Sequence, residues 1–188
     1  MAMLKFLTMM LRLPLIAWVV ALILSGCAHT PVKTVTDEPS PSVTGSVVEP
    51  VLLAHGGKLA LVSLKAGPQA EANNELDGIS TAVLTGIKDS LDGQKTSLHV
   101  IRTQDGQPEV VLEGYVQEFS QTSRLSRMMM HPNRGHLVLT GEIWLRTTGQ
   151  RLLTFSADKK FDPKKEKPMD VAYELGQNIG DFIGSHTR

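Results

Sequence analysis

The residues of this chain that could carry out chemistry form no recognisable catalytic pattern. Cys27 is the only cysteine among 188 residues. The sequence contains no Gly-x-Ser-x-Gly nucleophile elbow, His-Glu-x-x-His zinc motif, Cys-x-x-Cys pair or phosphate-binding glycine loop. We therefore predict that the protein is not an enzyme. Serine and histidine are numerous enough that a hydrolase site assembled only by folding remains an alternative.

A second group of chemically notable residues lies in the segment Met128–His136, between two predicted strands. Thioether and imidazole ligands suit Cu(I), so a copper or small-ligand site is one interpretation. Pro132, Asn133 and Gly135 instead indicate a long hairpin connection. We favour contact with a protein partner, because methionines adapt to varied surfaces and arginines pair with carboxylates or lipid phosphates. The candidate partner-binding residues are Arg124, Arg127, Met128, Met129, Met130, His131 and Arg134, and no metal or cofactor is assigned.

The N-terminus has the pattern of an export signal. Lys5 and Arg12 precede an apolar stretch from Leu13 to Leu24. Its dozen residues fall within the roughly 7–15 of a signal's hydrophobic region and short of the ~20 that span a bilayer. Leu24, the last residue of this stretch, begins the tetrapeptide Leu24-Ser-Gly-Cys27.

In these residues the chain resembles bacterial lipoprotein precursors, whose lipobox is Leu-x-Gly-Cys. The resemblance implies cleavage between Gly26 and Cys27 and acylation of the Cys27 sulfur and amine. Two or three acyl chains hold a protein durably at a membrane. Ala28, in place of an aspartate, implies the outer membrane within this family. A retained transmembrane helix and a signal without lipid are the alternatives.

Three regions are expected along the chain. Residues 1–26 form the signal peptide, and their removal from the 188 leaves 162, enough for one domain. Residues 27–57, rich in proline, serine and threonine, are predicted to be a disordered tether, although Val47–Leu53 could dock as a short strand or helix. Residues 58–188 form the folded domain. Its nearly balanced charge gives no electrostatic footprint for nucleic acid.

Hydrophobic periodicity predicts an α+β domain with a single antiparallel or mixed sheet of about five strands and two packed helices. Small residues recur every four positions in both predicted helices, which indicates close helix–helix or helix–sheet approach. Gly149 is expected to supply a positive φ in a turn, Trp144 and Phe155 to lie in the core, and Lys159–Lys167 to form a solvated loop. The expected strands are 58–64, 96–103, 110–120 and a hairpin at 136–161, and the expected helices run from 73 or 74 to 91 and from 170 to 185.

Three segments resemble the small α/β domain of the N-terminus of TolB and of several outer-membrane lipoproteins. They are Leu59–Ser63, Leu112–Phe119 and Leu139–Gly149. The lipoproteins include the DUF4410 type, the curli-secretion type and lipoprotein activators of peptidoglycan synthases. The resemblance implies no shared catalytic residues. We expect a non-enzymatic interaction module on the periplasmic side of the outer membrane, bound to an envelope protein of an assembly, transport or cell-wall machine.

Overall fold

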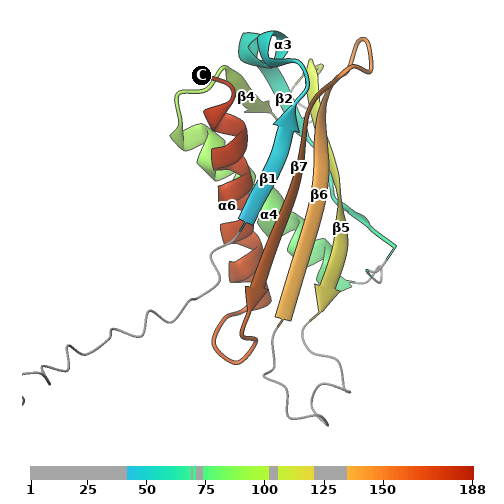
Figure 1. Cartoon of the computed structure of the whole chain (residues 1–188), viewed down its shortest axis with the longest axis vertical. Coiled ribbons are helices and arrows are strands. Elements are labelled where there is room, and N and C mark those ends of the chain that lie inside the picture. The colour runs from blue at the N-terminus through green and yellow to red at the C-terminus, as the bar shows by residue number, and fades with distance from the viewer. Residues whose placement is uncertain (1–41, 69, 71–73, 102–105, 121–134) are drawn as a thin grey trace, which may run out of the picture. The chain divides into compact units, whose positions relative to one another are not determined.

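The computed structural model describes residues 42–68, 70, 74–101, 106–120 and 135–188, in which seven strands form one mixed sheet. The strand order is β1-β7-β6-β5-β2-β4 (Figure 1). The short strand β3 pairs with β5 beyond the end of β2. An α+β fold with one mixed sheet is thus confirmed. The strands are β1 (Ser42–Val47), β2 (Gly57–Leu61), β3 (Lys65–Ala66), β4 (Leu98–Ile101), β5 (Val110–Ser120), β6 (Gly135–Leu145) and β7 (Arg151–Phe161).

Two long helices, α4 (Asn74–Gly93) and α6 (Pro168–Ser185), lie on one face of the sheet (Figure 1). α4 lies between β2 and β4 in the sequence, and these two strands pair in parallel, as a crossover helix requires. β5, β6, β7 and β1 pair antiparallel in that order. None of the described helices is long and apolar enough to cross a bilayer.

The core lies between the sheet and the two long helices. Every second residue of the long strands points into it. Leu112 on β5, Ile143 on β6 and Leu153 on β7 are cross-strand neighbours and fully buried. Ile79 and Ile179 on the facing helices are also fully buried. The intervening strand residues point to the opposite side, which we call the outer face of the sheet.

The predicted close approach of small residues is confirmed where α4 meets α6. A Cβ added to Gly86 would lie 2.9 Å from the backbone nitrogen of Gln177, and one added to Gly176 would lie 3.0 Å from the Cα of Val83. Gly180 approaches the carbonyl oxygen of Ile87 in the same way. These contacts follow the same order along both sequences, so α4 and α6 run parallel, and their backbones are in close contact.

The predicted boundary between tether and domain at residue 57 is wrong, because two elements of the domain precede it. β1 pairs with β7 over all six of its residues, and α3 (Pro50–His55) follows it. Val43 and Val47 pack on the core, and Leu53 is fully buried. The apolar residues therefore fit a strand and then a helix once β7 offers a pairing edge, and both alternatives for Val47–Leu53 are partly correct.

Two further expectations about single residues need correction. Lys159 belongs to β7 and is only 5% exposed; its Nζ lies 2.5 Å from Glu174 Oε2 and 3.6 Å from Glu166 Oε1. It points toward α6, so it is not part of a solvated loop. Trp144 is half-buried on the outer face opposite Val111, whereas Phe155 is buried as expected.

Candidate functional site

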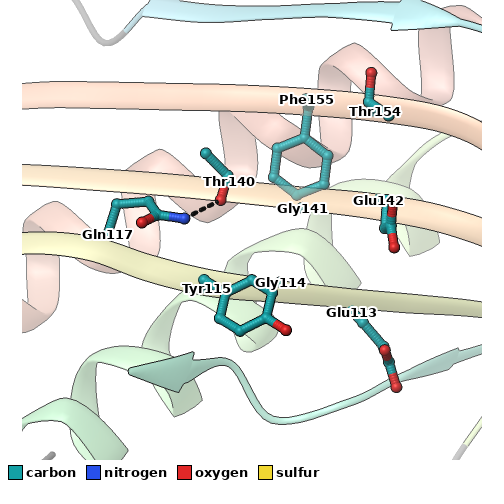
Figure 2. Close-up of a pocket in the computed structure, with 9 residues that line it drawn as sticks. All are labelled: Glu113, Gly114, Tyr115, Gln117, Thr140, Gly141, Glu142, Thr154 and Phe155. Atoms are coloured by element: carbon teal, nitrogen blue, oxygen red, sulfur yellow. Dashed lines mark hydrogen bonds between the residues drawn. The ribbon is translucent and has the colours of Figure 1, made fainter. Parts of the chain in front are cut away.

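A shallow depression of about 400 Å³ lies on the outer face, over the middle of β5, β6 and β7 (Figure 2). Its floor is the cross-strand row Gly114–Gly141–Phe155, which presents only backbone to this side because the Phe155 ring packs into the core. Two rows of outward side chains border the floor. The polar and aromatic lining residues are Glu113, Tyr115, Gln117, Thr140, Glu142 and Thr154.

Strand register decides which of these side chains meet. Tyr115 stands opposite Thr140, and Glu113 stands opposite Glu142. The register shift between Val116 and Glu118 leaves Gln117 as an extra residue, whose Nε2 donates to Thr140 Oγ1 at 2.8 Å (Figure 2). The bulge therefore aims an amide at the rim of the depression.

The depression carries negative charge and hydrogen-bond acceptors beside an aromatic ring. Like charges directly opposite on neighbouring strands repel, and Glu142 offsets part of this with an ion pair to Arg151 Nε at 2.6 Å. The side chain of Glu113 forms no ion pair or hydrogen bond with any residue the structure describes. Tyr115 is 44% exposed. This arrangement suits a partner surface that presents ammonium, guanidinium or hydroxyl groups next to an apolar group.

A second polar group lies on the outer face, near the last residues of β5 and β7 and the first residues of β6. His136 Nδ1 lies 3.3 Å from Glu118 Oε2, and its Nε2 lies 3.9 Å from Asp158 Oδ2. Ser42 donates a hydrogen bond to the other oxygen of Asp158. The serine thus contacts the carboxylate and not the imidazole, so His136 is not placed on its hydroxyl as the general base of a nucleophilic triad.

A third polar group joins the two long helices. The hydroxyl of Tyr173 on α6 donates to Asp89 Oδ2 on α4 at 3.0 Å. This hydrogen bond, with smaller contributions from desolvation and the negative charge of Asp89, raises the pKa of Tyr173 above its ordinary value. Farther along, Ser90 and Gln94 both donate to Asp181 at 2.7 Å. These contacts connect α4 to α6 and have a structural role.

The residues that the sequence singled out for function lie largely outside the described part of the chain. His136, the last residue of the proposed metal segment, is described, and it contacts carboxylates. Within the described residues no group of three or more His, Cys, Asp or Glu side chains could hold a metal ion. The lipidation and copper hypotheses therefore stay predictions. The candidate functional residues that lie outside the described part of the chain are Gly26, Cys27, Arg124, Arg127, Met128, Met129, Met130, His131 and Arg134.

Sequence reasoning missed the outer-face depression. Its signal was present in the alternation of Glu113, Tyr115 and Gln117 on one strand with Thr140 and Glu142 on another. Alternation shows which residues share a face of one strand, but the register that sets Gly114 beside Gly141 is a property of the assembled sheet.

Comparison with known proteins identifies a shared fold and no family. No family model matches the chain, and no curated protein matches it. Among solved structures, the PelC dodecamer from Paraburkholderia phytofirmans superposes with a TM-score of 0.55 at 14% identity, covering 77% of this chain and 97% of that chain. A variant of the same PelC gives a TM-score of 0.53 at 13% identity with the same coverage. A candidate lipoprotein from Caulobacter crescentus gives 0.42 at 12% identity, covering 72% and 92% of the two chains.

Proposed function

We propose that this protein is a lipid-anchored bacterial envelope lipoprotein, attached through Cys27 to the periplasmic face of the outer membrane. Its domain is a non-enzymatic module that binds another protein of an envelope assembly, transport or cell-wall machine. The anchor is supported by the lipobox sequence Leu24-Ser-Gly-Cys27.

The observation that supports the binding function is the difference between the two faces of the sheet. α4 and α6 bury one face, while the outer face holds a depression with an exposed tyrosine and two glutamates. A tyrosine at such a site combines a large contact area with a polar hydroxyl, which is typical of protein interfaces. PelC, which shares the fold, is a dodecamer, so a domain of this architecture can form stable contacts with protein.

The anchor is tested by labelling cells with radioactive palmitate. We expect label on the wild-type protein and its loss in Cys27→Ala, with the variant recovered outside the membrane fraction. Equal labelling of both proteins, or an unlabelled wild-type protein, would contradict the lipid anchor.

The binding surface is tested by site-specific photocrosslinking in intact cells. A crosslinking residue at Tyr115 or Thr140 probes the outer face, and one at exposed Thr85 on α4 is the matched control on the helical side. We expect a defined protein adduct from the first two positions and none from Thr85. Adducts of equal yield from all three positions, or from none, would refute the outer face as the binding surface.

A further inference from the structure

Among the described residues, β1 is the last strand on its side of the sheet and pairs with β7 alone (Figure 1). The nitrogen of Val48 donates to the carbonyl oxygen of Leu152 at 2.8 Å, in line with the β1–β7 register. Antiparallel ladders alternate, so Ser42, Thr44 and Ser46 direct their backbone groups to β7. The N–H and C=O groups of Val43, Gly45 and Val47 point away from the sheet, and no described residue bonds to them.

Within the part of the chain that the structure describes, this edge lacks the features that normally prevent strand pairing. Its six residues, Ser-Val-Thr-Gly-Ser-Val, include no charged residue and no proline, and their register with β7 contains no bulge. Natural edge strands are usually blunted by lysine, proline, a bulge or a covering element. The inner side of the strand is already apolar, because Val43 and Val47 pack on the core and the Phe182 ring of α6 fills the space beside Gly45.

The sequence of β1 is self-complementary about Gly45. When two copies run antiparallel with Gly45 opposite Gly45, Val43 meets Val47 of the other copy on the inner side. On the outer side Thr44 meets Ser46. Valine pairs and hydroxyl pairs are favourable cross-strand neighbours. The outward backbone groups at 43, 45 and 47 then exchange hydrogen bonds, as a two-fold symmetric ladder requires.

We propose that the free edge of β1 is a self-association site, at which two copies of this chain join their sheets antiparallel about a two-fold axis at Gly45. The dimer extends the helix-covered side continuously and leaves both outer-face depressions accessible. This proposal goes beyond the proposed function, because the outer face that binds a partner and the β1 edge that binds a second copy are different parts of the sheet.

The register can be tested by disulfide crosslinking of the full-length protein in cells. In the proposed ladder, Thr44 of one copy and Ser46 of the other copy form a non-hydrogen-bonded pair. Their Cα atoms are about 4.5 Å apart, which is within disulfide range. The two copies of Thr44 are about 8 Å apart, beyond that range. We expect a covalent dimer when differently tagged Thr44→Cys and Ser46→Cys chains are coexpressed. Neither variant alone, nor the wild type with Cys27, should form it.

The outcomes separate the competing explanations. A dimer from Thr44→Cys alone, or no dimer from the mixture, overturns the proposal. So does a disulfide adduct with a different protein in place of the dimer, which would assign the edge to another partner.

A charge experiment tests the same pairing without cysteine. Thr44→Lys with Ser46→Lys places like charges opposite each other, whereas Thr44→Lys with Ser46→Glu places opposite charges there. Both replaced side chains are exposed, so both double variants disturb the single chain similarly. In sedimentation of the detergent-purified protein we expect the wild type and the Lys/Glu variant at twice the chain mass and the Lys/Lys variant at one chain mass. A monomeric wild type, or equal masses for the two double variants, would overturn the proposal.

Discussion

Replacing Gly176 by alanine tests whether backbone contact between α4 and α6 holds the helical layer in place. The added Cβ would lie 2.9 Å from the carbonyl carbon of Val83 and 3.0 Å from its Cα. These are backbone atoms of α4, so no side-chain rotation relieves the overlap. The helices have to separate, and the buried residues Val83 and Ile179 then lose contacts.

The expected loss follows from two opposing effects. Overpacking a well-packed interior costs about 1–3 kcal/mol, and a clash with rigid backbone lies at the upper end of that range. Alanine in place of glycine inside a helix returns about 1 kcal/mol. The net expectation for Gly176→Ala is a loss of about 2 kcal/mol in the free energy of unfolding.

Urea unfolding followed by circular dichroism measures this difference. With a slope of about 2 kcal/mol/M, we expect the midpoint to fall by about 1 M. The melting temperature should fall by about 4–8 °C. The control is Gly93→Ala at the end of α4, where an added Cβ meets no atom within 4 Å, so stability should stay equal or rise slightly. A Gly176→Ala protein as stable as the wild type would refute the backbone-contact argument.

Three further predictions concern the other contacts that hold the domain together. Lys159→Met should leave the free energy of unfolding nearly unchanged. Glu174→Gln should lower it by about 1–3 kcal/mol, because the buried Lys159 ammonium then has weaker partners. Thermal melting of the two variants measures the difference. The Tyr173 pKa is raised in the folded state, so its contribution to stability is present below about pH 10 and is lost as the pH rises further. The stability difference between wild type and Tyr173→Phe in urea titrations should therefore narrow above pH 10, and a constant difference would contradict the Asp89 hydrogen bond. Gly149→Ala should lower the free energy of unfolding by about 1 kcal/mol, because φ is +69° there and no nearby atom adds a steric effect. The urea midpoint should then fall by about 0.5 M, and an unchanged midpoint would speak against that turn conformation.

Several elements could be predicted from sequence because their signals are local. The predicted strand 110–120 coincides with β5, and the hairpin predicted over 136–161 matches β6 and β7 within a residue. The helices predicted from 73 or 74 to 91 and over 170–185 match α4 and α6 within two residues at each end. Gly149 has the expected positive φ. Each of these follows from a period of two or 3.6, or from turn chemistry within a few residues.

The errors arose where a distant segment decides the outcome. β1 carries a short and weak pattern, and its strand conformation depends on β7, more than 100 residues later in the chain. Lys159 sits in a run of charges, and only the neighbouring carboxylates of Glu166 and Glu174 make its burial tolerable. Neither relation can be read from nearby residues.

The sequence by itself determined the order of most strands and helices, their core faces and the hypothesis of a lipid anchor at Cys27. Tertiary structure alone decided that β1 forms an edge, that Gly114 and Gly141 open a depression, and that Glu113 faces Glu142. The physical reason is that periodicity records how each segment turns its own apolar side inward. Register and edges arise only when separate segments pair, through hydrogen bonds between backbone groups that every residue type except proline shares.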